Sequence, residues 1–159
     1  MKNNKGFTIL ELVIAMTIAI ILGTLLINEN IKLVNNKKFE DTEKLLFNVI
    51  DKVKIDKIPI TFTKQGSNVI VNYGVNNIIS SDKVNYVDEI YFNSNKLNLN
   101  EKLLLKSGKF SGVIYGEIID SSGRVKKNGK LDKIELKYKN TLKFEIKYKN
   151  NKIEIKKWR

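Results

Sequence analysis

The sequence predicts an α+β fold in which a long N-terminal helix packs on a C-terminal antiparallel β-sheet domain. Three observations support this prediction: an apolar run over residues 7–27, apolar positions at three- and four-residue spacing over residues 31–53, and alternation of apolar and polar residues from Asp132 onward. With 159 residues, the chain has room for one compact domain beside a membrane segment.

The apolar run over residues 7–27 is interrupted by one ionisable side chain, Glu11. As a helix it would extend about 31 Å, which matches a hydrocarbon core of roughly 30 Å. A secretory signal has a shorter apolar region and small residues at a cleavage site, and neither feature is present here. We therefore expect a membrane-spanning helix. A carboxylate in such a helix costs about 2 to 3 kcal/mol on insertion scales, so we expect Glu11 to have a cationic partner.

Residues 1–14, MKNNKGFTILELVI, combine a short basic leader ending in Gly6 with Phe7, Thr8 and Glu11 at the head of the apolar run. This segment resembles the start of type IV prepilins and pseudopilins. The resemblance implies a pilin-like fold, cleavage by prepilin peptidase between Gly6 and Phe7, and N-methylation of Phe7. It also implies that Glu11 pairs with the N-terminal amine of a neighbouring subunit, since cleavage creates a cation one helical turn away.

The resemblance divides the chain into four parts. Residues 1–6 are a leader peptide, 7–27 the transmembrane half of the helix, 28–58 its amphipathic half, and 59–159 a β-rich domain outside the cytoplasm. The implied location is the bacterial cytoplasmic membrane, crossed once, and a pilus or pseudopilus after assembly. The implied partners are other pilin or pseudopilin subunits, prepilin peptidase, the inner-membrane assembly platform and the lipid bilayer.

The chain departs from the family pattern in two ways, of which the second favours a pseudopilin or minor subunit. Many members have a helix-kinking proline near the end of the apolar stretch, whereas this chain has Asn28 there and Gly23 as its one weak point. Many major pilins also close a C-terminal loop with two cysteines, and this chain has none. Residues 113–158, including Ser121-Ser122-Gly123-Arg124, resemble the β-domain of minor pseudopilins of the GspH and FimT type.

The second half of the helix is predicted from an amphipathic pattern. Apolar residues at helical spacing are separated by charged ones, and Glu40 with Lys44 forms an i,i+4 pair. Pro59, the only proline, predicts that the helix ends near Ile58. The apolar positions are Ile31, Val34, Leu45, Leu46, Val49, Ile50 and Val53.

Beyond Pro59 the pattern changes to strands. The predicted strands are residues 60–63, 69–73, 84–92 and 112–119, followed by a three-stranded meander from Asp132 with turns at Asn140-Thr141 and Asn150-Asn151. Residues 97–105 fit a strand or a short helix equally well.

The composition argues against catalysis. Histidine and cysteine are both absent, which removes the usual general base near neutral pH and the common zinc ligands. The acidic neighbours Glu40-Asp41 and Asp88-Glu89 lack the surroundings of a calcium loop. Gly108, Gly112 and Gly116 are expected at turns or bulges. We therefore expect no enzyme, no catalytic or metal-binding residue and no cofactor.

The net charge of +12 indicates a lysine-rich solvated surface or a polyanionic partner. The C-terminal residues Lys156, Lys157, Trp158 and Arg159 combine cations with an aromatic ring that can stack on a base, so they are candidate nucleic-acid contacts. Two functions follow: a structural minor pilin or pseudopilin of a type IV pilus, type II secretion or competence system, or a DNA-binding minor pilin for natural transformation, a role that FimT-type relatives suggest.

Overall fold

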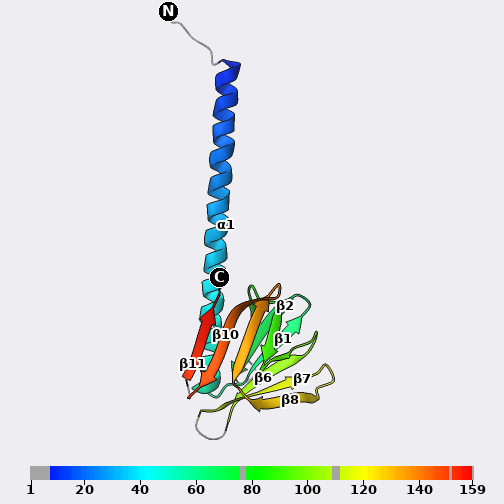
Figure 1. Cartoon of the computed structure of the whole chain (residues 1–159). Coiled ribbons are helices and arrows are strands. Elements are labelled where there is room, and N and C mark those ends of the chain that lie inside the picture. Colours follow the sequence, from blue (N-terminus) through cyan, green and yellow to red (C-terminus); the bar gives the residue numbers. More distant parts are fainter. Residues whose placement is uncertain (1–7, 76–77, 109–111, 151, 159) are drawn as a thin grey trace, which may run out of the picture. The chain divides into compact units, whose positions relative to one another are not determined.

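A computed structural model describes residues 8–75, 78–108, 112–150 and 152–158. The chain divides into two compact units, residues 1–38 and residues 39–159. Helix α1, Ile9–Lys54, contributes its first part to the first unit and its last part to the second (Figure 1). The predicted long helix is thus confirmed, although it ends at Lys54 and not near Ile58.

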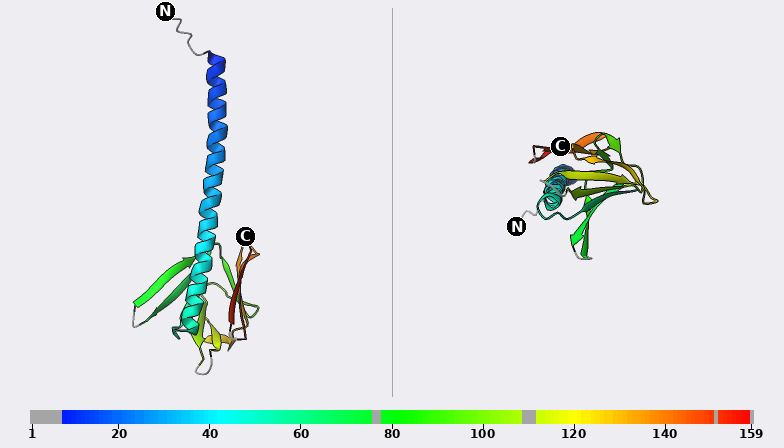
Figure 2. Two further views of the ribbon diagram at one scale, coloured as in Figure 1. Left: turned by 90° about the vertical axis from the view of Figure 1, so that its left-hand side faces the viewer. Right: turned by 90° about the horizontal axis from the view of Figure 1, so that it is seen from below.

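The second unit contains two antiparallel sheets. The six-stranded sheet has the order β3-β2-β1-β6-β7-β8, with strands β3 Ile78–Val84, β2 Asn68–Val75, β1 Ile60–Gln65, β6 Lys102–Ser107, β7 Ile114–Ile119 and β8 Val125–Lys130. The five-stranded sheet has the order β11-β10-β9-β4-β5, with strands β11 Lys152–Lys157, β10 Thr141–Lys149, β9 Lys133–Tyr138, β4 Glu89–Phe92 and β5 Asn95–Lys96. Figure 2 shows the two sheets on different sides of the C-terminal end of α1.

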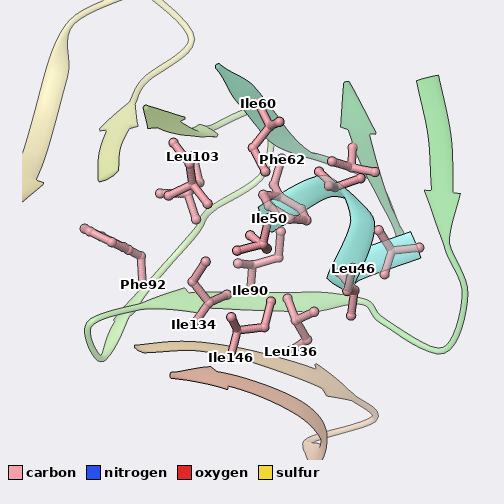
Figure 3. Packing of buried hydrophobic residues seen from close by; sticks show 14 of the residues in the cluster. Leu46, Ile50, Ile60, Phe62, Ile90, Phe92, Leu103, Ile134, Leu136 and Ile146 are labelled. Atoms are coloured by element: carbon pink, nitrogen blue, oxygen red, sulfur yellow. The ribbon is translucent and has the colours of Figure 1, made fainter. Parts of the chain in front are cut away.

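The core of the second unit forms where the end of α1 meets both sheets. Leu46 and Ile50 of α1 lie between Phe62 of the six-stranded sheet and Ile134 of the five-stranded sheet (Figure 3). All four side chains are fully buried. Burying a side chain of this size contributes about 1.5 to 3 kcal/mol each, so the helix end and both sheets stabilise one another. The buried helix residues share one face: Phe39, Thr42, Leu46, Val49, Ile50 and Val53.

The predicted C-terminal meander is confirmed as β9, β10 and β11. Its first turn is shifted by one residue from the prediction, because Tyr138 pairs with Thr141 and the two turn residues are Lys139 and Asn140. Both have positive φ, 49° and 62°, as a two-residue hairpin that matches strand twist requires. At the second turn Asn150 has φ 51°, and Asn151 lies outside the described residues.

One predicted strand, residues 84–92, is wrong. Residues Ile78–Val84 form β3 of one sheet and Glu89–Phe92 form β4 of the other. Between them Tyr86 adopts φ 56°, and the carboxylate of Asp88 accepts the backbone N–H of Lys139. The left-handed residue turns the chain from one sheet to the other, a change of direction that the apolar residues on both sides of it concealed.

The remaining strand predictions are confirmed or refined. Residues 60–63, 69–73 and 112–119 fall on β1, β2 and β7, and the ambiguous segment 97–105 provides most of β6. Strands β3, β5 and β8 were not predicted as separate strands. Strands β3 and β8 are the edges of the six-stranded sheet, and every residue of β8 except Gly129 is exposed.

Gly116 lies inside strand β7 and is neither a turn nor a bulge residue, so that expectation is wrong. A Cβ at this position would lie 2.4 Å from the ring of Phe92 on β4. The absent side chain therefore lets the two sheets pack through Phe92, which is buried. Gly112, by contrast, has φ 65° and lies at a turn, as expected.

Candidate functional site

Thr8 and Glu11 form a capping box at the start of α1. The backbone N–H and the hydroxyl of Thr8 both donate to Oε2 of Glu11, at 2.9 and 2.8 Å. The backbone N–H of Glu11 donates in return to the Thr8 hydroxyl oxygen at 3.2 Å, and the N–H of Leu12 donates to the Thr8 carbonyl. The bonds from the Thr8 and Glu11 N–H groups satisfy two of the backbone donors that the first turn of a helix otherwise leaves without partners, and the bond from Leu12 is a regular i→i−4 bond of the helix.

This role of Glu11 was missed in the reading of the sequence. The signal was present, because Thr8-Ile9-Leu10-Glu11 has the Thr-x-x-Glu spacing of a capping box directly before an apolar run. The carboxylate therefore has hydrogen-bond donors within its own chain. Hydrogen bonds lower the cost of holding a charge in an apolar environment but do not neutralise it.

The predicted processing site lies outside the described residues. Gly6 and Phe7 precede Thr8, the first residue that the structure describes. Cleavage between Gly6 and Phe7 and methylation of Phe7 therefore stay predictions. The part of the site that the structure describes begins one residue after the expected new N-terminus.

The apolar side chains in the first part of α1 have no partner among residues 8–38, the part of the first unit that the structure describes. From Ile9 to Ile27 every large apolar side chain is at least half exposed, with Ile9 at 84%. By length and composition α1 is long and apolar enough to cross a membrane. An exposed apolar surface of this length is costly in water, so it requires lipid or other helices around it.

Polar side chains in this part of α1 bond to the helix itself. The hydroxyls of Thr17 and Thr24 donate to the carbonyls of Val13 and Ile21, each at 2.8 Å. Asn30 Nδ2 donates to the Leu26 carbonyl at 2.9 Å. Because lipid offers no hydrogen-bonding partner, such internal bonds allow polar residues to enter a membrane helix. The helix also continues through Gly23 and Asn28.

The C-terminal candidate residues do not form one cluster. Lys157 lies opposite Phe144, on the buried face of the sheet, and forms an ion pair with Glu43 of α1. Lys156 lies opposite Glu145, on the other face. Neighbouring residues of a strand point to opposite faces, so β11 separates the two lysines. Trp158 is 40% exposed, and Arg159 lies outside the described residues.

The acidic neighbours at the start of β4 have protein partners. Asp88 accepts the N–H of Lys139, and Glu89 pairs with Lys96 and accepts the hydroxyl of Tyr91 at 3.2 Å. The hydrogen bond from Lys96 is the largest cause that lowers the pKa of Glu89. Within residues 8–75, 78–108, 112–150 and 152–158, no group of three or more acidic residues is arranged to hold a metal ion.

Glu101 is a buried carboxylate that the sequence did not single out. It is 5% exposed and accepts hydrogen bonds from the backbone of Asn98 at 2.8 Å and from Lys126 of β8. Burial raises the pKa of Glu101, but the bonds from Lys126 and Asn98 outweigh it, so the pKa is lowered overall. Its partners fix the turn before β6 to the edge strand β8, which is a structural role.

Comparison with known proteins gives one match. Searches of curated proteins and of solved structures found none. Residues 1–27 match the family model described as the prokaryotic N-terminal methylation motif. The matched segment contains the leader, the Gly6-Phe7 junction, the capping box and the apolar part of α1. The match supports a type IV prepilin-like chain, a substrate of prepilin peptidase that is anchored in the membrane by its N-terminal helix.

Proposed function

We propose that this chain is a structural minor pilin or pseudopilin subunit of a type IV pilus, a type II secretion system or a competence pseudopilus. The observation that carries the proposal is the methylation motif over residues 1–27, in which the residues from Ile9 onward form an exposed apolar helix with one carboxylate in its first turn. In this role, residues 7–27 hold the subunit in the bilayer before assembly. The same residues pack against the helices of neighbouring subunits in the filament, with the second unit outside the cytoplasm.

Glu11 provides the register of assembly in this proposal. The Thr8 bonds engage Oε2 of the carboxylate, and Oε1 is the oxygen that we assign to the methylated amine of a neighbouring Phe7. An ion pair in low dielectric is favourable when both charges also keep hydrogen bonds, and the capping box supplies these to Glu11. A subunit inserted at a different height would leave both charges without an ionic partner.

The proposed role requires no catalysis. Its support is the absence of histidine and cysteine from the sequence and the engagement of Glu101, Glu89 and Asp88 in structural bonds. The inner-membrane assembly platform would be the partner that moves the subunit into the filament.

The test is to follow the chain in cells with and without an active prepilin peptidase. Membranes are treated with a short lysine-reactive cross-linker, and products are separated on denaturing gels and identified by mass spectrometry. The proposal predicts cross-links to other methylation-motif proteins, formed only by the shortened chain and only when the peptidase is active. A shortened chain that forms no such cross-link would contradict a filament role while leaving processing intact.

DNA binding is the second candidate function, favoured by the outer face of the five-stranded sheet. Lys149 lies opposite Lys152, and Lys156 follows on the same face of β11. We propose that this face contacts phosphate if the subunit takes part in transformation. Lys156→Ala should then weaken DNA binding and reduce its salt dependence, while Lys157→Ala, on the buried face, should leave both unchanged. Equal effects of the two variants would exclude this face.

A further inference from the structure

A groove runs between α1 and the last strand of the five-stranded sheet. It has a volume of about 470 Å³ and is lined by Glu43, Lys44, Phe47 and Asn48 of α1 and by Ile155 of β11. Phe47 is 51% exposed, although its neighbours Leu46 and Val49 are buried in the core. A half-exposed phenylalanine beside a partly buried isoleucine forms an apolar floor that lacks a cover within the described residues.

Strand β11 borders this groove and has one free edge. It pairs with β10 and with no other described strand. The N–H of Trp158 donates to the carbonyl of Lys143, so even-numbered residues of β11 direct their backbone groups toward β10. By the alternation of an antiparallel ladder, Ile153 and Ile155 direct their N–H and C=O groups away from it. The edge therefore offers main-chain donors and acceptors next to an apolar groove.

The side chains along this edge carry an ordered charge pattern. On the outer face of β11, Lys152, Glu154 and Lys156 alternate with Ile153 and Ile155, which pack toward the core. A strand added to this edge would place its own outer residues beside Lys152, Glu154 and Lys156, whose charges are positive, negative and positive in turn. Opposite charges across neighbouring strands stabilise a pair, and like charges destabilise it. The complementary strand therefore has acidic, basic, acidic residues separated by apolar ones.

We propose that the free edge of β11 accepts an extended strand from a different protein, in which apolar residues alternate with mainly acidic ones. Its apolar side chains would enter the groove at Phe47 and Ile155, and its backbone would continue the five-stranded sheet. A second copy of this chain is disfavoured by its net charge of +12. Its exposed edge β8 carries Lys126, Lys127 and Lys130 with no acidic residue, so it does not complement β11. This inference does not depend on the filament role.

The test uses the full chain in non-ionic detergent micelles and three fluorescent peptides. The first contains Glu-Val-Lys-Val-Glu, the second has the same composition in the scrambled order Val-Val-Glu-Glu-Lys, and the third has exchanged charges, Lys-Val-Glu-Val-Lys. Fluorescence anisotropy should show that the first binds at least about tenfold more tightly than either control. Equal binding of the first two peptides would mean general attraction to a basic protein and would overturn the proposal, as would no binding.

Variants locate the binding at this edge. Phe47→Gln should weaken binding of the first peptide about tenfold, whereas Leu99→Gln, which removes another exposed apolar side chain, should not change it. Ile153→Pro removes an outward N–H without breaking the β10 ladder and should abolish binding. Lys152→Glu combined with Lys156→Glu should invert the preference between the first and third peptides. Unchanged binding in Phe47→Gln would contradict this groove as the binding site. Self-association of the chain that the first peptide disrupts would contradict a different protein as the occupant.

Discussion

The hydroxyl and the backbone N–H of Thr8 both bond to the same oxygen of Glu11, Oε2, at 2.8 and 2.9 Å. The carboxylate that the sequence suggested as an assembly register is thus also a helix cap. The two roles are compatible, because Thr8 bonds to one oxygen of the carboxylate and the proposed neighbouring amine would bond to the other. They make different predictions for substitutions at the two residues.

Glu11→Ala should leave leader cleavage and membrane insertion intact, since removing a charge makes insertion easier. Assembly should be lost, because truncating one partner of a buried ion pair costs about 3 to 5 kcal/mol. Glu11→Gln should be intermediate, as it keeps an acceptor without charge. The measurement is cross-linking to partner subunits beside an immunoblot for processing.

Thr8→Val is the matched control for Glu11. It removes both bonds of the hydroxyl, the one to Oε2 and the one from the Glu11 N–H, but keeps the charge and the bond from the Thr8 backbone N–H. It should therefore cost about 0.5 to 2 kcal/mol of helix-end stability and leave assembly largely intact. If Thr8→Val abolishes cross-linking as fully as Glu11→Ala, capping is the role that matters. The intersubunit ion pair would then be unsupported.

Gly116→Ala should destabilise the second unit, because the new methyl group would meet the Phe92 ring at 2.4 Å. The expected loss is about 1 to 3 kcal/mol, as for other overpacked cores. Thermal unfolding of the full chain in micelles, followed by circular dichroism of the β-sheet signal, measures it.

Phe92→Leu tests whether the Phe92 ring causes the destabilisation expected for Gly116→Ala. If the ring is what excludes a side chain at Gly116, the double variant should be more stable than the sum of the two single losses predicts. Additive losses would place the cause of the Gly116→Ala effect elsewhere in β7.

Much of this fold could be predicted from the sequence because its main patterns are local. The helical spacing from Leu46 to Val53 and the alternation of Ile134, Leu136, Phe144 and Ile146 predict burial, and the structure confirms it. The apolar run forms the exposed first part of α1, and Ile31 and Val34 are exposed as well. Two edge strands, β3 and β8, gave no such signal. Strand β8, with the sequence VKKNGK, is held by backbone pairing to β7 and buries none of its side chains, so no periodicity marks it.

The candidate site was predictable in part. Glu11 was found because a charge in an apolar run is conspicuous. Its hydrogen bond to Thr8 was missed because a partner for the charge was expected only on a neighbouring subunit. The candidate nucleic-acid contacts, residues 156–159, were taken together because they are neighbours in the sequence. The face that each residue takes depends on the register of β11 with β10, which sets Lys157 against Phe144 and Lys156 against Glu145. Register across strands is a tertiary property.

Glu101→Gln should lower the stability of the second unit at pH 7 by about 1.5 to 3 kcal/mol, the range for hydrogen bonds to a charged group. The pKa of Glu101 is lowered in the folded state from its ordinary value of 4.5. Its ionised form therefore stabilises the fold above pH 4.5, and this contribution is lost as the pH falls through the lowered value. The difference between wild type and variant should shrink over that acidic range.

Chemical unfolding at several pH values measures the Glu101 effect. Glu154→Gln, at an exposed position of β11, is the control and should change stability by less than about 0.5 kcal/mol at any pH. A Glu101→Gln difference that stays constant from pH 7 to acid would show that folding does not lower the pKa of Glu101, and would contradict this role of its hydrogen bonds.

Glu43 and Lys157 join α1 to β11, but their side chains are 30% and 35% exposed. A partly solvated pair is worth about 0 to 1 kcal/mol, so a double-mutant cycle with Glu43→Gln and Lys157→Met should give a coupling energy in that range. High salt should reduce the coupling. A coupling above about 2 kcal/mol would mean that the pair determines how β11 is held.

Mass spectrometry of the N-terminal peptide, on protein purified from native membranes, tests most directly whether this chain is a processed, methylated prepilin-like subunit. The predicted result is a chain that begins at Phe7 with an N-methylated amine, as the motif over residues 1–27 indicates. A chain that retains Met1, or one that is cut near Asn28 after the apolar run, would contradict it.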